Sequence, residues 1–334
     1  MRLWLRRGSG ALLLWPLSLL FRLVTALRHA LYAGGLLRST RLPVPVIVVG
    51  NIFVGGTGKT PLVIWLAEAL RAAGYRPGVI SRGYGTQGSA PQPVSATSSP
   101  EMVGDEPLLI AQRTGCPVMV GRDRAAAGLA LLAAHPEVNL IISDDGLQHY
   151  RLQRDLEIVL CDERGNGNGF MLPAGPLREP ASRRRDFTVV NGTIAPEKQH
   201  DVVQMQLAGD MAEQLANRSH RVPLAALSET AGHQPARIVA AAGIGNPARF
   251  FTMLRRAGLD FEALPLPDHF DYKTSPFRGN QADIILITEK DAVKCALFEL
   301  PENIGRIWVV PVAAHIDAAL AGQIVEKLRG IRIA

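Results

Sequence analysis

A glycine-rich stretch behind an apolar run is the feature that most restricts the fold of this chain. Residues 43–50 (PVPVIVVG) are apolar and rich in β-branched side chains, which is typical of a parallel strand buried on both faces. They lead into NIFVGGTGKTP at 51–61, and a helical pattern follows at 61–73. Three glycines let several backbone N–H groups turn toward one anion, and the helix adds the positive end of its dipole. The sequence therefore predicts a strand–loop–helix unit that binds phosphate.

The residue types in this loop indicate a nucleotide. Lys59 can reach the β- and γ-phosphates, and the Thr60 hydroxyl can ligate Mg²⁺. The pattern departs from GxxxxGK[ST], because Phe53 stands at the first glycine position. Partition-type ATPases share the double glycine but carry a lysine where this chain has Val54, which counts against an ATPase switch. A glycine-rich turn with an incidental lysine is the alternative, and the flanking strand and helix disfavour it. The expected nucleotide-binding residues are Gly55, Gly56, Thr57, Gly58, Lys59, Thr60 and Pro61.

A second apolar run, at 138–143, ends in the paired acids Asp144 and Asp145. In nucleotide-binding sheets an acid at the tip of a neighbouring strand completes the Mg²⁺ shell, directly or through water. Two adjacent carboxylates repel each other unless a cation offsets their charge. The alternative is a solvated strand-to-loop turn, since Asp-Gly is common there. Because the pair follows a phosphate-binding unit, we expect Thr60, Asp144 and Asp145 to form a magnesium site.

Alternating strand and helix patterns predict an α/β fold with a parallel sheet of the P-loop NTPase type. A polar stretch at 209–235 is a plausible linker, and a second, smaller α/β unit follows it. The expected division is an N-terminal segment (1–40), a P-loop nucleotide-binding domain (41–208), a linker (209–235) and a C-terminal domain (236–334). Three cysteines without paired spacing indicate no disulfide framework and favour a reducing compartment.

The positive charge is concentrated at the N-terminus. The first 41 residues hold seven arginines and no acid, so the net charge of +6 leaves −1 for the remaining chain. A charge confined to one end argues against a nucleic-acid-binding face and favours contact with an anionic membrane surface. No nucleic acid and no obligate protein partner are expected.

The segment 11–27 is apolar apart from Arg22, Ser18 and Thr25. As a helix it would be about 26 Å long, slightly short of a bilayer core. A polar stripe opposite an apolar face favours a helix that lies in the membrane interface over one that spans it, since Arg22 would cost about 3 kcal/mol inside. A cleaved signal peptide is the third alternative. The stripe comprises Arg7, Ser18, Arg22, Thr25 and His29, and the face comprises Leu17, Leu20, Phe21, Val24, Leu27 and Leu31.

Further polar clusters are each compatible with a cap or turn when taken singly, but together they carry a resemblance. They are SRGYG (81–85), VGDEP (103–107), DDGLQH (144–149), LPAGPLREP (172–180), GIGNPARFF (243–251), LPDHFDY (266–272) and TEKDAVK (288–294). With the phosphate loop, these motifs closely resemble the tetraacyldisaccharide 4′-kinases of Gram-negative bacteria, in family order from about residue 43 to residue 294. The basic, apolar N-terminus is similar to the membrane-associating segment of that family.

The resemblance implies transfer of the γ-phosphoryl group of ATP to the 4′-hydroxyl of a tetraacylated glucosamine disaccharide 1-phosphate. The product is lipid IVA, and the enzyme works at the cytoplasmic face of the inner membrane with ATP and Mg²⁺. Asp105 would accept the hydroxyl proton while His269 orients it and raises its basicity, so domain closure could gate the reaction. The remaining implied roles are charge neutralisation by Arg178, metal binding and catalysis by Asp144 and Asp145, and acceptor binding by Arg82 and Tyr84.

Two other functions stay open at this point. A membrane-tethered nucleotide switch, an ATPase or GTPase, is favoured by TEKD at 288–291, which is similar to the guanine-reading [NT]KxD motif but displaced by one residue. A soluble sugar or nucleotide kinase, with an N-terminus unrelated to its activity, is the second.

Overall fold

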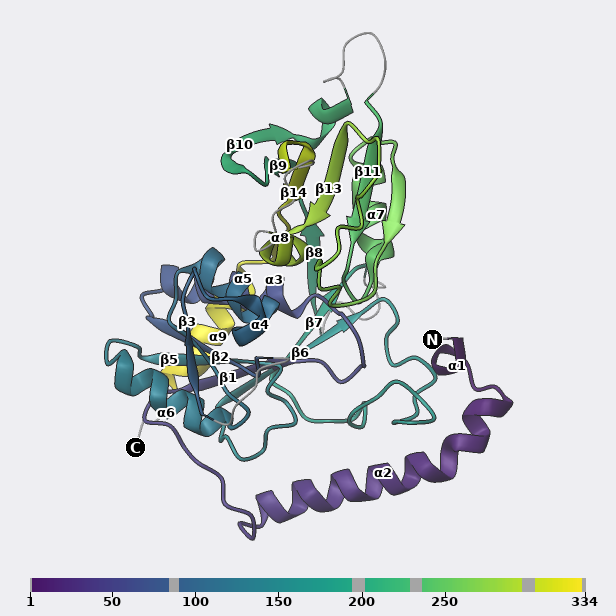
Figure 1. Ribbon diagram of the computed structural model, residues 1–334. Coiled ribbons are helices and arrows are strands. Elements are labelled where there is room, and N and C mark those ends of the chain that lie inside the picture. The colour runs from purple at the N-terminus through teal and green to yellow at the C-terminus, as the bar shows by residue number, and fades with distance from the viewer. Residues whose placement is uncertain (1, 84–89, 194–201, 229–235, 296–303, 332–334) are drawn as a thin grey trace.

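The chain forms two β-sheets, each the centre of its own unit, and the two units follow one another along the molecule (Figure 1). The computed structural model describes residues 2–83, 90–193, 202–228, 236–295 and 304–331, so the expected substrate residue Tyr84 lies outside the described residues. The first sheet has nine strands in the order β15-β8-β7-β6-β1-β5-β2-β4-β3. The strands are β1 (Val46–Gly50), β2 (Pro77–Ser81), β3 (Gln92–Val94), β4 (Val118–Val120), β5 (Leu140–Asp144), β6 (Leu156–Asp162), β7 (Phe187–Asn191), β8 (Val203–Ala208) and β15 (Ala313–Ile316).

The parallel α/β fold expected from the sequence is confirmed in this sheet. Its strands from β8 to β4 run parallel, and only the edge strands β3 and β15 pair antiparallel. Every residue of β1 is buried, as its unbroken apolar run predicts. One face of the sheet packs against α3 (Lys59–Ala72), α5 (Asp105–Thr114) and α9 (Ala319–Arg329), and the other packs against α6 (Arg124–Ala134). A short helix, α4 (Pro100–Val103), leads into α5.

The second sheet has six strands in the order β10-β9-β14-β13-β11-β12. Four of them run parallel, while β9 and β10 add an antiparallel edge. Its faces are covered by α7 (Pro247–Arg256) and α8 (Glu289–Cys295). The other elements are β9 (Met211–Gln214), β10 (Asn217–Pro223), β11 (Ile238–Ala242), β12 (Glu262–Pro265), β13 (Ile284–Thr288), β14 (Ile307–Val310) and the 3-10 helices η2 (Leu224–Ser228) and η3 (Ile304–Arg306).

The chain divides between the sheets differently from the expected boundaries. The stretch 209–235, expected as a linker, contains β9 and β10 and so contributes to the second sheet. After β14 the chain returns to the first sheet, where β15 pairs with β8 and α9 packs on α3 through Leu320, Ile324 and Leu328. The second unit is therefore inserted between β8 and β15. Its two connections touch, because a Cβ on Gly209 would lie 2.3 Å from the carbonyl oxygen of Pro311.

A long N-terminal helix lies along the outside of the first unit (Figure 1). The short α1 (Arg2–Leu5) precedes α2 (Ser9–Ala33), which is long and apolar enough to cross a membrane and has 11% of its most apolar window buried. The inward face includes Ser18, whose hydroxyl donates to the carbonyl of Met171 at 2.8 Å. Phe21, expected on the same apolar face as the exposed Leu17 and Leu20, instead faces the body and is half-buried.

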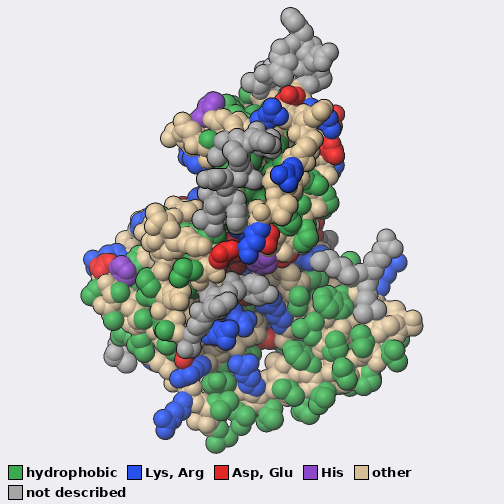
Figure 2. Space-filling model, viewed as in Figure 1, with side chains coloured by type: hydrophobic (Ala, Val, Ile, Leu, Met, Phe, Trp, Pro, Cys, Tyr) green, Lys and Arg blue, Asp and Glu red, His purple; other side chains and the backbone are tan. Residues whose placement is uncertain are grey.

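The outer face of α2 exposes a continuous apolar surface, visible as a green band in Figure 2. Leu13 is 82% exposed and Leu23 is 64% exposed. An exposed apolar patch of this kind is typical of a surface that contacts a membrane or another protein. The exposed apolar residues of the helix are Leu12, Leu13, Trp15, Leu17, Leu19, Leu20, Leu23, Val24 and Leu27.

Candidate active site

The loop between β1 and α3 has the backbone geometry of an anion cradle. Gly55 (φ 109°) and Gly58 (φ 96°) both adopt left-handed conformations that favour glycine. A Cβ on Gly58 would meet the side-chain nitrogen of Asn191 at 2.6 Å, and that nitrogen donates to the carbonyl of Thr57 at 2.8 Å. The glycines are thus required by both conformation and space, and Asn191 at the tip of β7 holds the loop from outside.

The structure explains why Phe53 replaces the expected first glycine. Its ring is buried in the core beneath the sheet, and the Arg164 guanidinium lies 4.3 Å from the ring centroid. The next residue, Val54, donates its N–H to the carbonyl of Pro176 at 2.9 Å, and Arg178 N–H donates to the carbonyl of Ile52 at 2.7 Å. The LPAGPLREP segment therefore supports this side of the loop through backbone hydrogen bonds. The Phe53 side chain, at the position where a glycine was expected, packs in the core.

Lys59, Asp145 and Arg178 meet beside the loop, although they come from three different segments. Lys59 Nζ lies 3.6 Å from Asp145 Oδ1, and Arg178 Nη1 lies 3.3 Å from Asp145 Oδ2. Burial would raise the pKa of Asp145, but the two cations outweigh it and lower the pKa below its ordinary value. Lys59 also donates to Asn51 Oδ1 at 3.2 Å. The structure thus brings together three residues that the sequence proposed for phosphate transfer.

Asp144, at the tip of β5, is the buried member of the acid pair. Its Oδ2 accepts a hydrogen bond from the Ser81 hydroxyl at 2.9 Å, and its Oδ1 has no hydrogen-bond partner among the described residues. Burial, with the charge of Glu106, raises the pKa of Asp144 to about 7. A buried carboxylate oxygen without a partner suits a cation ligand.

Asp105 and His269 come from different units and meet across the cleft. Asp105 begins α5 after Gly104, whose φ of 90° allows the sharp turn, and its side chain is 7% exposed. The Nδ1 atom of His269 lies 3.1 Å from Asp105 Oδ2. Acidic, basic and histidine side chains gather at the boundary between the two units in Figure 2. The expected contact between the VGDEP and DHF motifs is present in the structure.

The electrostatics of this pair differ from expectation. Burial would raise the pKa of Asp105, but the hydrogen bond with His269 and the charges of Lys290 and Lys294 lower it to about 2. The same hydrogen bond raises the pKa of His269. His269 therefore stabilises the carboxylate, and the expected rise in the basicity of Asp105 is wrong for this arrangement. The pair favours an imidazolium beside a carboxylate.

The sequence reasoning missed the two lysines of α8 that surround Asp105. Lys290 Nζ lies 3.0 Å from Glu106 Oε1 and 3.8 Å from Asp105 Oδ2, and Lys294 Nζ lies 3.7 Å from the same Asp105 oxygen. The charge of Glu106 also contributes, after burial, to the raised pKa of Asp144, so Glu106 affects the acid pair as well as Lys290. The signal available in the sequence was the TEKDAVK motif, to whose lysines no role had been given.

A backbone contact joins the phosphate loop to the second unit. A Cβ on Gly245, in the GIGNP turn, would lie 2.8 Å from the backbone nitrogen of Gly56. Two residues earlier, Gly243 donates its N–H to Asp291 Oδ2 at 3.0 Å and accepts from the N–H of His269 at 3.2 Å. One turn thus touches the loop, the α8 motif and the dyad.

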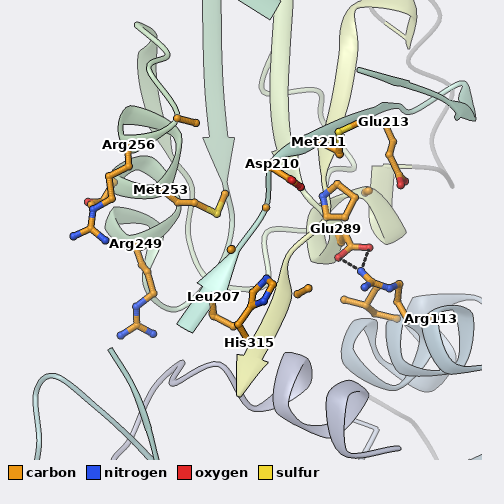
Figure 3. A pocket seen from close by; sticks show the side chains of 18 of the residues that line it. Arg113, Leu207, Asp210, Met211, Glu213, Arg249, Met253, Arg256, Glu289 and His315 are labelled. Carbon is orange, nitrogen blue, oxygen red and sulfur yellow. Dashed lines mark hydrogen bonds and ion pairs between the residues drawn. The ribbon is translucent and has the colours of Figure 1, made fainter. Parts of the chain in front are cut away.

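A cavity of about 1480 Å³ separates the two units beside this contact (Figure 3). Arg113 of α5 and Glu289 of α8 pair across it, at 2.8 and 2.7 Å from Arg113 Nη1 to the two carboxylate oxygens. On the other side Arg249 of α7 reaches within 3.5 Å of Asp162 at the tip of β6. The two units are therefore joined by charged pairs at the border of this cavity.

The remaining expected substrate residue, Arg82, follows β2 and is exposed. Burial, followed by the charges of Arg124 and Arg82, lowers the pKa of His149 in the DDGLQH motif to about 4. The exposed position of Arg82 leaves its guanidinium accessible to a ligand.

Comparison with known proteins identifies the family. A family model described as tetraacyldisaccharide-1-P 4′-kinase matches residues 10–329. The chain belongs to the tetraacyldisaccharide 4′-kinase family. The kinase of Herminiimonas arsenicoxydans with that name is 61% identical over 343 residues, covering 100% of this chain and 96% of the relative. That of Dechloromonas aromatica is 50% identical over 336 residues, covering 98% and 96%.

A solved structure supports the same assignment. The crystal structure of LpxK from Aquifex aeolicus, in complex with ATP, has a TM-score of 0.77 and 30% identity, and the match covers 95% of this chain and 99% of that one. The chain is thus a kinase of this family that uses ATP, as the sequence predicted. Family membership decides against the nucleotide-switch alternative. The TEKD residues instead contact Asp105 and Gly243.

Proposed function

We propose that this kinase transfers the γ-phosphoryl group of ATP to the 4′-hydroxyl of a tetraacylated glucosamine disaccharide 1-phosphate, yielding lipid IVA for lipid A biosynthesis. The observation that carries the proposal is the Asp105–His269 pair, 3.1 Å apart, in a chain that also has a GGTGKT phosphate-binding loop before α3. The names of the relatives supply the substrate class.

Lys59 and Arg178 neutralise the charge that spreads over the transferred group. Phosphoryl transfer depends mainly on positioning and electrostatic stabilisation, because its transition state is loose. Asp145 holds both cations within 3.6 Å, so they are already oriented toward one place. Arg82 and Tyr84 would bind the acceptor from the end of β2.

Thr60, Asp144 and Asp145 are the residues that would hold Mg²⁺. Among the described residues no three carboxylate, histidine or cysteine side chains converge on one point. Mg²⁺ is commonly bound by one or two carboxylates together with substrate phosphates, so this donor set fits it. The unpartnered Oδ1 of buried Asp144 supports the assignment. When bound, the ion would neutralise charge on the β- and γ-phosphates.

Asp105 is the group that accepts the proton of the sugar hydroxyl. With a pKa near 2 it is a carboxylate throughout the physiological range. It is a weak base, which suffices when the hydroxyl loses its proton late in a loose transition state. His269 fixes the orientation of Asp105 and supplies a compensating charge. Because the two residues belong to different units, separation of the units would break the dyad, which is formed in the arrangement of this structure.

The α2 helix would bring the enzyme to its substrate at the cytoplasmic face of the inner membrane. An acceptor with four acyl chains stays in the bilayer, at about 0.8 kcal/mol per buried CH₂. The exposed leucines of α2 offer an apolar surface, and the arginines of the N-terminal segment offer charge to anionic lipid. We propose an interfacial position for the helix.

One assay tests the activity. Purified protein is incubated with γ-labelled ATP, Mg²⁺ and detergent-dispersed acceptor, with Asp105→Asn as the control of strongly reduced but measurable turnover. Label on the glycolipid is expected for the natural sequence. Label found only in free phosphate would reject the proposal. If deletion of residues 1–35 leaves membrane association and turnover unchanged, the soluble-kinase alternative gains instead.

A further inference from the structure

We propose that Lys294 is a positioning residue, which holds the Asp105 carboxylate in place across the cleft from the second unit. The inference rests on the proposed role of Asp105 as proton acceptor and adds a residue to it. Lys294 belongs to the TEKDAVK motif at the C-terminal end of α8, whereas Asp105 begins α5 of the first unit.

The surroundings of Lys294 point to a charge kept for one purpose. Its side chain is 10% exposed, and Nζ has no hydrogen-bond partner in the described part of the chain. It lies 3.7 Å from Asp105 Oδ2 and 3.8 Å from Asp291 Oδ1, with the ring of Tyr272 5.6 Å away. A buried ammonium without a hydrogen bond is unfavourable, so its stabilisation comes from the two carboxylates.

Lys290 does not duplicate this arrangement. It donates to Glu106 at 3.0 Å, and its contacts with Asp105 (3.8 Å) and Asp268 (3.7 Å) are longer. Lys290 therefore has a hydrogen-bond partner of its own, while the ion-pair partners of Lys294 within the described part of the chain are Asp105 and Asp291. The groups that face Asp105 are His269 from the DHF loop, Lys290 and Lys294 from α8, and Glu106 beside it in α5, which pairs with Lys290.

Asp291 links Lys294 to the phosphate loop. Its Oδ2 accepts hydrogen bonds from Gly243 N–H at 3.0 Å and from the Thr288 hydroxyl at 2.6 Å, and the residue is fully buried. The turn that begins at Gly243 includes Gly245, which touches Gly56. The position of Lys294, and with it that of Asp105, is thus set by the same turn that contacts the loop.

The test removes the pair together, because Lys294→Met alone would leave Asp291 as a buried, uncompensated charge. The double variant Lys294→Met/Asp291→Asn is compared with the natural sequence, and both are also made in the background of Asp105→Asn. The matched control is Lys327→Met on α9, which breaks an exposed ion pair between Lys327 and Asp186. The single variant Lys294→Arg keeps the positive charge beside Asp105 and Asp291. Its kcat should therefore lie between that of the double variant and that of the natural sequence.

The expected result is a fall in kcat of at least about tenfold, with KM for ATP changed by less than about twofold. The loss should disappear in the Asp105→Asn background, because Lys294 acts through that carboxylate. An acid limb should also appear in the kcat–pH profile, since Asp105 loses a compensating charge while burial still raises its pKa. The proposal is overturned if the double variant has the same kcat and the same kcat–pH profile as the natural sequence. It is also overturned if the double substitution lowers kcat by the same factor with Asp105 and with Asp105→Asn.

A second readout needs no glycolipid and separates this inference from the proposed function. Without Lys294 the folded-state pKa of Asp105 rises above its natural value of about 2, so the Tm deficit of the double variant should narrow as pH falls from neutral toward 2. The narrowing should be absent when Asp105→Asn is also present. A deficit independent of pH in both backgrounds contradicts the inference, even if the natural protein phosphorylates the glycolipid. Absence of glycolipid phosphorylation by the natural protein contradicts only the proposed function.

Discussion

Lys59 Nζ lies 3.6 Å from Asp145 Oδ1, so the lysine of the phosphate loop and the acid after β5 are paired across neighbouring strands. Arg178 shares the same carboxylate at 3.3 Å. The negative charge of Asp145 keeps two long cationic side chains beside the loop, where a triphosphate tail would take over their charge. This relationship makes Lys59 the first residue to test.

Lys59→Ala should lower kcat by about 10²–10³-fold, the usual cost of removing one group that stabilises transition-state charge. The fold should persist, because the lysine side chain is outside the hydrophobic core. Turnover measured with labelled ATP, together with Tm, checks the prediction. Lys327→Met serves as an exposed control on α9. Turnover within twofold of the natural value would exclude Lys59 from the chemistry.

Asp105→Ala and His269→Ala should be strongly non-additive. Each should reduce kcat by roughly 10²–10⁴-fold, since the two side chains form one hydrogen-bonded unit at 3.1 Å. The double variant should then be about as slow as the slower single variant. A kinetic double-mutant cycle measures the coupling. Losses that multiply would show that the two residues act separately.

The stability of the enzyme should depend on the ionisation of Asp105. Its folded-state pKa of about 2 lies below the ordinary value of 3.8, so its stabilising contribution is present above pH 4 and is lost as pH falls toward 2. The shift corresponds to about 2 kcal/mol at pH 7. Urea unfolding should show Asp105→Asn less stable at pH 7, with the difference closing between pH 4 and pH 2. Exposed Asp260→Asn is the control, and a gap that stays constant with pH would contradict the assignment.

Gly245→Ala should weaken ATP binding. The added methyl group would lie 2.8 Å from the Gly56 nitrogen, and backbone on both sides leaves little room to yield. Displacement of the loop should raise the Kd for ATP, measured by calorimetry, on the order of tenfold. Gly305→Ala has no atom within 4 Å of the new methyl group and should bind normally. Natural affinity in Gly245→Ala would show that the turn does not constrain the loop.

Replacing exposed leucines of α2 should reduce membrane binding without harming the fold. Leu13→Glu and Leu23→Glu each remove a side chain that would contribute about 1.5–3 kcal/mol on burial in lipid. Co-sedimentation with anionic phospholipid vesicles measures the loss, and Leu129→Glu on α6 is the matched control. Higher salt should also weaken binding if the N-terminal arginines contribute. Equal binding by all variants would reject α2 as the membrane contact.

Local patterns allowed much of the first unit to be predicted from the sequence. The buried run of β1, the glycines after it and the acids after β5 carry their own signals, because each depends on neighbours within a few residues. The structure places Lys59, Asp145 and Arg178 together, in agreement with the expectation. The family motifs extended this reasoning to the Asp105–His269 contact, which spans 164 residues.

Features that depend on distant contacts were missed. Lys290 and Lys294 approach Asp105 only because α8 packs on α5, and no local pattern encodes that packing. The return of β15 to the first sheet was missed for the same reason, since β15 has only four residues and pairs with β8 about a hundred positions earlier. The orientation of Phe21 followed the docking of α2 onto the body, which overrode its helical periodicity.

The insertion of the second unit between β8 and β15 has a mechanical consequence. Two polypeptide crossings run side by side at Gly209 and Pro311, so close that a single methyl group would not fit between them. A double tether of this kind resists twisting and sliding and leaves swinging about one axis as the easy movement. We therefore expect any separation of the two units to carry His269 away from Asp105 and back along one path, because the covalent layout of the chain limits the other movements.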